Sequence, residues 1–290
     1  MSRLRETVRV VTAHRQSEGG GFLVRRPFPG AGLEQVDPFL LLDEMGPADY
    51  GPGEALGAPD HPHRGFETVT YLLVGEMEHE DSAGHRGTLG PGDVQWMTAG
   101  SGVVHSEMPS RKILREGGRL HGFQLWVNLP ARDKMMPPRY QEVPAVRIPK
   151  AVSPDGKVRV AVIAGEALGV HAVIETRTPI LCHDWTLESG ADVTTPVPDG
   201  FDAFGYVFEG EALVAGEKCR DGQMAILGPA GGVRLTCAVS APGPARLLLV
   251  GGAPLREPVA RRGPFVMNTD EEIRQALLDF RSGRMGRIGR

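Results

Sequence analysis

Cysteine is scarce in this chain of 290 residues, and the three that it has, Cys182, Cys219 and Cys237, are widely spaced. Small disulfide-stabilised domains and four-cysteine zinc sites both need more cysteines at closer intervals. The sequence therefore excludes a disulfide scaffold and a four-cysteine zinc site.

Long apolar runs are also missing. No stretch approaches the ~18 uninterrupted apolar residues of a membrane-spanning helix. Residues 1–16 carry charges throughout, where a signal peptide would have an apolar core. We expect a soluble, cytoplasmic protein with no membrane partner.

Neither sign of charge is in large excess. The chain has 32 Lys and Arg against 36 Asp and Glu, which gives a formal net charge of −4. A protein whose surface is built for nucleic acid is usually strongly basic. We therefore expect no direct contact with nucleic acid.

Glycine and proline are abundant, at 39 and 24 residues. Because helix interiors tolerate neither residue well, their number excludes a helical bundle. Short apolar runs bounded by turn residues recur instead, which is typical of the strands of a sandwich or barrel. The clearest runs in the first half of the chain cover residues 38–42, 68–74, 94–97 and 122–127.

Part of this pattern occurs twice. The segment Tyr71–Glu76 returns as Tyr206–Glu211, an offset of 135, and Gly92–Val94 is echoed by Gly222–Met224 at an offset of 130. A repeat of this length indicates two duplicated β domains. The Pro-rich and charged segment 130–149 is the predicted linker, which places the domains at residues 1–135 and 136–290.

One helix is predicted near the end of the chain. Thr269 and Glu272 have the spacing of a capping box, in which each side chain bonds the backbone N–H of the other residue. A single apolar stripe follows, and Gly283 is expected to end the helix. The stripe consists of Ile273, Ala276, Leu277 and Phe280.

The chemistry is predicted to lie in two short segments of the first domain. His61 and His63 are two residues apart, as are His105 and Glu107, so each pair shares one face of an extended chain. If the segments lie side by side in a barrel, three imidazoles and one carboxylate converge on one point. Gly65, Gly100 and Gly102 flank the pairs, and Pro62 favours a strand start or an edge strand.

Three nitrogens and one anionic oxygen suit a divalent ion such as iron, manganese, copper, nickel or zinc. Four protein ligands leave two positions of an octahedron open for water, dioxygen or substrate. Glu67 is a rival carboxylate, but in an extended strand it would lie about 13 Å beyond His63. We therefore favour Glu107 as the ligand and give Glu67 a supporting role.

The other reactive side chains give weaker signals. Cys182, His183 and Asp184 have the composition of a catalytic triad, but three consecutive residues cannot all face one point. His79 and His85 belong to a polar hairpin, whereas His121 precedes a strand and is a candidate for contact with a metal ligand. Phe66, Phe123 and Trp126 are candidates for lining a pocket, with core packing as the alternative.

The repeat also predicts which domain carries the metal. Residues 61 and 63 shifted by 135 fall on Pro196 and Pro198, and residues 105 and 107 shifted by 130 fall on Leu235 and Cys237. These four cannot reproduce the same ligand set. We expect the second domain to hold no metal and to serve as scaffold, pocket wall or contact surface.

The segments that carry these residues closely resemble the signature of the pirin family. They are His61–Tyr71, Gln95–Gly100 and His105–Pro109, with further similarity over Asp37–Glu44, Leu125–Leu129 and Gly263–Thr269. The resemblance spans nearly the whole chain and is looser between residues 151 and 250.

This resemblance implies an all-β bicupin, that is, two jelly-roll β-barrels, with a short C-terminal helix. It implies one mononuclear divalent metal in the N-terminal barrel, usually iron, with manganese, copper, nickel, zinc or cobalt left open. The family's ligands fall on His61, His63, His105 and Glu107, and the C-terminal barrel of pirins lacks ligands.

The resemblance also implies two functions. Several pirins are similar to quercetin 2,3-dioxygenases, which open a flavonol ring with dioxygen and release carbon monoxide. In such an enzyme Glu107 would also accept the proton of the 3-hydroxyl if it leaves or loosens from the ion. Other pirins are iron-dependent redox-sensing regulators that bind a transcription factor or a metabolic enzyme. We expect the dioxygenase, with a flavonol and dioxygen as small-molecule partners, and keep the regulator as the alternative.

Overall fold

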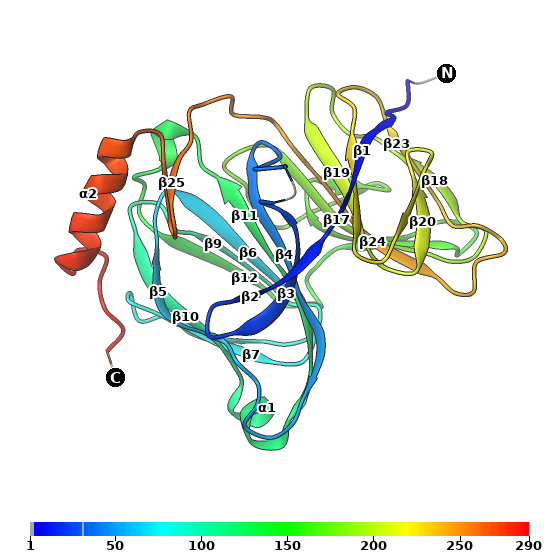
Figure 1. The fold of residues 1–290 in the computed structure, drawn as a ribbon. Helices are drawn as coiled ribbons and strands as arrows, with labels where there is room; N and C mark the ends of the chain where they lie inside the picture. The colour runs from blue at the N-terminus through cyan, green and yellow to red at the C-terminus, as the bar shows by residue number, and fades with distance from the viewer. Residues whose placement is uncertain (1–2, 31, 290) are drawn as a thin grey trace. The chain divides into compact units, whose positions relative to one another are not determined.

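The computed structural model describes residues 3–30 and 32–289 and is built mainly of β-strands (Figure 1). It divides into two compact units. The first unit comprises Arg15–Arg26, Phe39–Ala145 and Leu255–Arg290, and the second comprises Met1–His14, Pro27–Pro38 and Val146–Pro254. No helix among the described residues is long and apolar enough to cross a membrane.

The first unit contains a seven-stranded and a four-stranded antiparallel sheet. The larger sheet has the order β12 (Arg139–Val143), β9 (Val94–Thr98), β6 (Phe66–Val74), β11 (Gly118–Asn128), β4 (Phe39–Tyr50), β3 (Phe22–Phe28) and β2 (His14–Glu18). The smaller sheet has the order β5 (Ala58–His63), β10 (Val103–Pro109), β7 (Met77–Asp81) and β8 (Arg86–Leu89).

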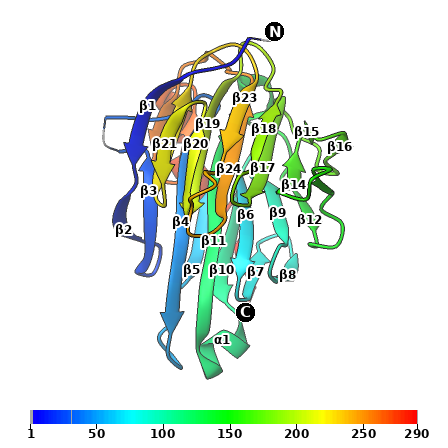
Figure 2. The same ribbon diagram turned by 90° about the vertical axis from the view of Figure 1, so that its right-hand side faces the viewer.

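The second unit repeats this arrangement (Figure 2). Its larger sheet has the order β1 (Thr7–Thr12), β22 (Gln223–Leu227), β19 (Asp202–Glu209), β24 (Ala245–Gly252), β17 (Ile180–Leu187), β14 (Val158–Ala164) and β13 (Lys150–Val152). Its smaller sheet has the order β18 (Asp192–Thr195), β23 (Val233–Thr236), β20 (Glu211–Val214) and β21 (Glu217–Arg220). A two-stranded ribbon, β15 (Glu166–Ala167) and β16 (Val170–His171), contacts β14 of the larger sheet.

Strand order confirms the predicted duplication. β6, which carries Tyr71, lies between β9 and β11, and β19, which carries Tyr206, lies between β22 and β24. The two matching segments thus occupy equivalent central strands. Helix α1 (Arg111–Glu116), which joins β10 to β11, was not among the predicted elements.

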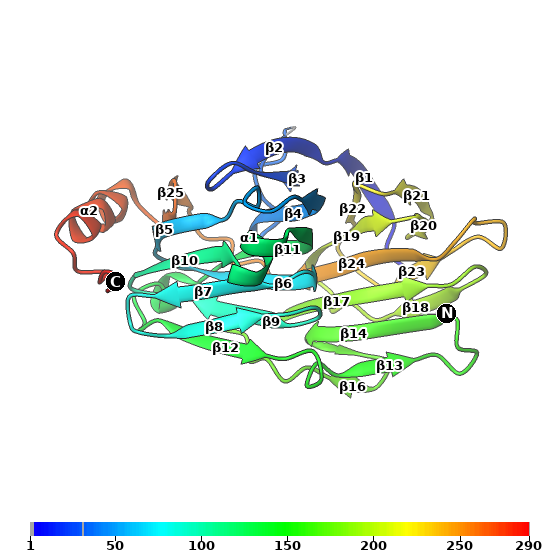
Figure 3. The ribbon, with the colours of Figure 1, turned by 90° about the horizontal axis from the view of Figure 1, so that it is seen from below.

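The unit boundaries differ from the predicted division at residue 135. β1 pairs with β22 and so completes the larger sheet of the second unit, although it begins the chain. At the other end, β25 (Ala260–Arg262), β26 (Phe265–Met267) and helix α2 (Asp270–Arg281) belong to the first unit (Figures 1 and 3). An unpaired sheet edge is a liability that a further strand or a covering segment removes. Here segments from the two ends of the chain pack on the unit that is distant from them in sequence.

Two segments differ from their prediction: one predicted strand is longer, and the predicted linker contains regular structure. The run at residues 38–42 belongs to β4, which continues to Tyr50 because β11 pairs with it throughout. The expected linker at 130–149 contains a 3₁₀ turn (Ala131–Asp133) and strand β12, which pairs with β9 at the edge of the larger sheet.

Helix α2 begins as predicted. Thr269 and Glu272 form the complete capping box, and the cap residue at the other end is Ser282, followed by Gly283 at a φ of +76°. Ile273 and Ala276 are buried, as expected, but Phe280 is 39% exposed. Asp279 turns inward instead, because its carboxylate pairs with Arg64 at 2.8 Å.

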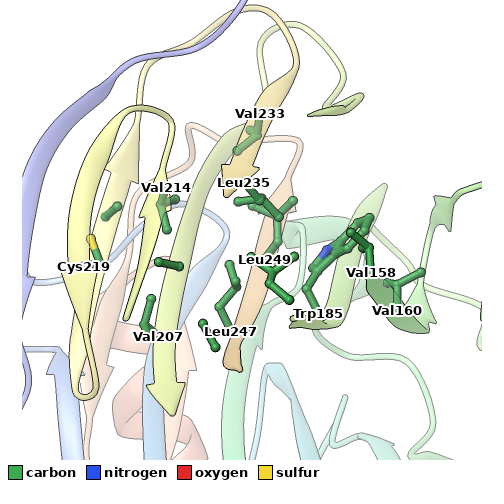
Figure 4. Packing of buried hydrophobic residues seen from close by; sticks show 14 of the residues in the cluster. Val158, Val160, Trp185, Val207, Val214, Cys219, Val233, Leu235, Leu247 and Leu249 are labelled. Atoms are coloured by element: carbon green, nitrogen blue, oxygen red, sulfur yellow. The ribbon is translucent and has the colours of Figure 1, made fainter. Parts of the chain in front are cut away.

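The core of the second unit fills the space between its two sheets with apolar side chains (Figure 4). Trp185 on β17 and Leu247 and Leu249 on β24 are fully buried against Val214 on β20 and Leu235 on β23. The corresponding space of the first unit is different, because it contains a cavity lined by His61, His63 and His121.

Candidate metal centre

Strands β5 and β10 bring the predicted histidines together. The two strands pair antiparallel, with His61 directly opposite His105 and His63 opposite Val103. Directly opposite residues point to the same face of a sheet, and so do residues two apart on one strand. One ligand nitrogen from each of the three histidines lies within 4.8 Å of the others. The predicted convergence of the two segments is confirmed for these three residues.

Backbone features next to the histidines explain how the strands meet. β5 is an edge strand, as Pro62 predicted. Gly65 adopts a φ of +87° and Gly100 a φ of +50°, and the Gly65 N–H donates to the Gly100 carbonyl at 2.9 Å. The left-handed backbone at both glycines lets the chain turn directly beside the ligand segments.

Burial keeps the rings of His63 and His105 neutral. His63 is 3% and His105 is 1% exposed. Burial lowers the pKa of both rings well below the ordinary value, and the neighbouring histidines lower it further. A neutral imidazole has the lone pair that a metal ion needs.

The hydrogen bonding of the three rings fits a bound metal. Nδ1 of His61 donates to the Pro59 carbonyl at 2.7 Å, which leaves its Nε2 as the acceptor nitrogen. Nδ1 of His63 and both ring nitrogens of His105 are buried without a hydrogen-bond partner among the described residues. Buried polar atoms are rarely left this way, so these atoms point to a missing ligand. The donor set fits one divalent transition-metal ion.

Glu107 follows His105 on β10 but does not belong to the group of three. The ladder with β5 shifts between the two residues, so that Glu107 lies opposite Ala58. The Thr70 hydroxyl donates to Glu107 Oε1 at 2.7 Å, and Gln124 Nε2 lies 3.4 Å from the same oxygen. Glu107 lines the same cavity as His61 and His63. Its role as a fourth ligand stays a prediction.

Glu67 lies elsewhere. It is fully buried on β6 in the larger sheet, and the Thr98 hydroxyl donates to its carboxylate at 2.6 Å. It is neither in the histidine group nor on the cavity wall. This position agrees with the supporting role expected for it.

His61 and His63 line a cavity of about 500 Å³ between the two sheets. Trp126 lines it, with its ring centroid 5.3 Å from that of His63. Phe66 packs behind both rings and Phe123 is buried in the core, so Trp126 is the one of the three predicted aromatics on the wall. The remaining apolar lining includes Phe22, Leu41, Tyr50, Leu72 and Leu120.

Sequence reasoning missed several wall residues. Arg261 and Pro264 come from the C-terminal segment, nearly 200 residues from His63. Arg26 and Asp43, which also line the cavity, form a two-pronged ion pair of 2.6 Å and 2.5 Å. No local pattern marks these residues, because only the tertiary pairing of distant strands brings them to the wall.

Comparison with known proteins agrees with this geometry. The family description "Pirin" matches residues 21–127, and "Pirin C-terminal cupin domain" matches residues 182–286. Pirin from Homo sapiens is 47% identical over 281 residues, covering 95% of this chain and 92% of the human protein. This chain belongs to the pirin family.

Further relatives extend the comparison. A pirin-like protein of Solanum lycopersicum is 46% identical over 288 residues, an alignment that covers 98% of this chain and 94% of the tomato protein. The crystal structure of quercetin 2,3-dioxygenase from Acinetobacter baumannii superposes with a TM-score of 0.90 at 36% identity, covering 99% of this chain and all of the other. The two units are therefore the two cupin domains of a pirin-family bicupin.

The remaining histidines of the N-terminal cupin domain pair with carboxylates. His79 pairs with Glu142 and His85 with Asp81, each at 2.8 Å. His121 was predicted as a possible contact of a metal ligand. It lines the cavity and bonds Glu44 at 2.8 Å.

The C-terminal cupin domain carries different residues at the equivalent positions. Leu235 on β23 faces Val193 on β18, and Thr195 faces Val233, so Val193 and Thr195 match His61 and His63. The predicted equivalents Pro196 and Pro198 were wrong, because the loop between β18 and β19 does not have the length that the 135-residue offset assumes.

The sequence Cys182-His183-Asp184 does not form a nucleophilic site. The three residues alternate along β17, and burial raises the pKa of Cys182 to about 12. A thiol with that pKa stays protonated near neutral pH and is a poor nucleophile. The low weight given to a triad here is consistent with this geometry.

Proposed function

We propose that this chain is a metal-dependent dioxygenase that opens the ring of a flavonol such as quercetin. One observation carries the proposal: His61, His63 and His105 converge beside a largely apolar cavity that Trp126 lines, and Nδ1 of His63 and both ring nitrogens of His105 have no hydrogen-bond partner among the described residues. The similarity to a quercetin 2,3-dioxygenase over the whole chain supports it.

His61, His63, His105 and Glu107 would hold the ion, which we propose to be iron. When bound, a ferrous ion supplies a Lewis acid for the flavonol oxygens and an electron-rich centre for dioxygen. The remaining contributions come from the protein, which binds the flavonol rings, excludes water and takes up a proton.

The cavity has the dimensions and lining of a site for a planar aromatic molecule. Its volume of about 500 Å³ lies in the usual range for small-molecule sites, and its lining is mostly apolar with a smaller number of polar groups. Trp126 contributes aromatic surface to the wall beside His63. The apolar side chains of the lining would keep water from the reacting carbons.

Glu107 is the proposed base for the 3-hydroxyl proton. The Thr70 hydroxyl and the Gln124 amide hold its carboxylate at the cavity wall. In the overall reaction both oxygen atoms of dioxygen enter the product, at the two carbons that flanked the hydroxylated carbon. That carbon leaves with its own oxygen as carbon monoxide, and the proton held by Glu107 ends on the product carboxylate.

The test is turnover of quercetin by iron-loaded protein under oxygen, with carbon monoxide and loss of the flavonol absorbance as readouts. We expect turnover by the wild type and by His171→Ala, which replaces an exposed histidine of the other domain, and none by His61→Ala. Iron content is measured for each variant. Equal turnover by His61→Ala and wild type contradicts the proposal.

A second candidate is a regulator that binds a protein partner according to its metal state. The observation that favours it is the link between the histidine group and helix α2. Arg64, next to His63, donates to Asp279 of that helix, whose outer face exposes Leu278 and Phe280. Hydrogen exchange across α2 that differs between ferrous and ferric protein supports this candidate, and identical exchange argues against it.

A further inference from the structure

The cavity continues past the candidate metal ligands along strand β11. Alternate residues of a strand share one face, and those of β11 that line the cavity are Leu120, Gly122, Gln124 and Trp126. Gln124 Nε2 lies 3.4 Å from Glu107 Oε1, and Leu120 is four residues further, about 13 Å along an extended strand. A ligand attached at the metal centre must therefore extend along β11 to reach the end of the cavity at Leu120.

This far end of the cavity is apolar, and its wall is formed by Leu23, Tyr50, Leu56 and Leu120. Leu120 and Tyr50 pack with Ala55, the residue before Leu56. The hairpin that joins β2 to β3 reaches the same place, because the Gly20 N–H donates to the Gly57 carbonyl at 2.9 Å. That contact brings Leu23, at the start of β3, to the side of Leu56.

Two leucines of the far end are exposed although they line the cavity. Leu23 is 56% exposed and Leu56 is 44% exposed. Single exposed leucines are common on protein surfaces, but exposed apolar side chains that gather at a cavity are typical of a place where a ligand binds. An apolar group seated between these two side chains would leave water together with both of them, which is favourable.

The polar side chains of the neighbouring wall bond to one another. His121 bonds Glu44 at 2.8 Å, and Arg26 bonds Asp43 at 2.6 Å. The outer rings of quercetin carry hydroxyl groups, and a hydroxyl that is buried beside leucine side chains without a partner costs free energy. An apolar chain in place of the hydroxyl hydrogen avoids that cost and adds favourable burial.

We propose that Leu23 and Leu56 determine specificity, by selecting aromatic ligands that carry an apolar chain on the part distant from the metal-binding oxygens. The inference rests on the proposed function, since it takes a flavonol-like ligand at the histidines. It names a substrate class within that function: flavonols with an alkyl or prenyl chain on one of the outer rings.

The chain offers a matched control. Leu213 on β20 is a leucine of the other cupin domain that is 38% exposed and does not line the cavity. Leu213→Gln removes the same apolar side chain from the surface as Leu23→Gln or Leu56→Gln. All three substitutions leave the net charge unchanged, and none removes a candidate metal ligand.

The experiment is anaerobic calorimetric titration of zinc-loaded protein, which binds without turning over. The ligands are quercetin, its 7-O-butyl and 4′-O-butyl ethers, and the two matching 3-hydroxypropyl ethers, whose chains have the same length but end in a hydroxyl. All of them keep the 3-hydroxyl and the 4-carbonyl.

We expect wild type and Leu213→Gln to bind one of the butyl ethers about tenfold more tightly than quercetin, because the exposed leucines bury only part of the chain. The matching hydroxypropyl ether should bind no more tightly than quercetin. Binding of the preferred butyl ether should also have the more negative heat-capacity change, which marks apolar burial. Leu23→Gln and Leu56→Gln each lose part of the preference, and the double variant loses it while it keeps its affinity for quercetin.

The outcomes separate this inference from the proposed function. A preference that persists in the double variant, or that is absent from wild type although quercetin binds, overturns the inference and leaves the dioxygenase standing. Equal affinity for the butyl and hydroxypropyl ethers also overturns it, since chain length and not apolar character would then decide. If wild type binds none of the flavonols, the inference and the proposed function fall together. Zinc content and thermal stability are measured for each variant, and the single variants decide if the double variant is misfolded.

Discussion

Replacing Gly65 by alanine tests how the ligand strands are held together. A Cβ at this position would lie 1.9 Å from the Val266 carbonyl oxygen and 2.8 Å from Met267 Sδ. The first of these is a backbone atom, so the strands themselves must separate. Gly65 also has a φ of +87°, and its carbonyl accepts from Lys134 Nζ at 2.7 Å.

The magnitude follows from two terms. The left-handed backbone costs alanine about 1–2 kcal/mol. Separating β26 from Gly65 loosens the buried hydrogen bonds around it, for about 1–3 kcal/mol more. We expect Gly65→Ala to lower the unfolding free energy of the N-terminal cupin domain by about 2–5 kcal/mol. It should also weaken zinc binding, because His63 moves with Gly65.

Gly84 provides the control, since its φ is +90° and nothing lies within 4 Å of a Cβ placed on it. Gly84→Ala introduces only the unfavourable left-handed backbone and should lower the free energy of unfolding by about 1–2 kcal/mol. The assay is urea titration followed by hydrogen exchange of peptides from β5 and β10. Equal losses for the two variants, or unchanged zinc affinity in Gly65→Ala, would refute the reasoning.

Three further predictions concern the C-terminal cupin domain and the proposed base. Trp185→Ala removes a fully buried ring and should cost about 3–5 kcal/mol, measured by urea unfolding of the C-terminal cupin domain; a loss below about 1 kcal/mol contradicts the core described above. Burial lowers the pKa of His183 to about 4. Between about pH 6.5 and 4, the unfolded chain therefore binds a proton at His183 that the native state does not, and the free energy of unfolding falls as the pH drops. His183→Leu should reduce the slope of the unfolding free energy against pH in this range. An unchanged slope excludes His183 as its source. Thr70→Val keeps the side-chain shape but removes the hydrogen bond to Glu107, and should lower kcat/KM for quercetin about tenfold at unchanged iron content; a wild-type value would mean that Glu107 needs no such support.

Local spacing was sufficient to find the part of the site that two strands provide. His61, His63 and His105 were predicted because residues two apart share a face, and β5 and β10 pair in the register that brings these faces together. The helix cap at Thr269 was equally local. Such features depend on a few consecutive residues, which a sequence displays directly.

Features that depend on distant pairing were not predictable in this way. Nothing in the residues near Arg261 indicates that β25 would reach Trp126, and nothing in β1 shows that it completes the sheet of the other cupin domain. The apolar period of α2 suggested that Phe280 faces inward, but Arg64 offers Asp279 a buried ion pair that outweighs it. In each case the partner lies more than 100 residues away.

The central claim is that the three histidines hold one metal ion. Anaerobic titration with ferrous ion, followed by metal analysis after desalting, tests it directly. We predict one iron per chain for the wild type and for His171→Ala, and none for the double variant His61→Ala, His105→Ala. A wild-type protein that retains no iron, or a double variant that retains one per chain, would contradict the account.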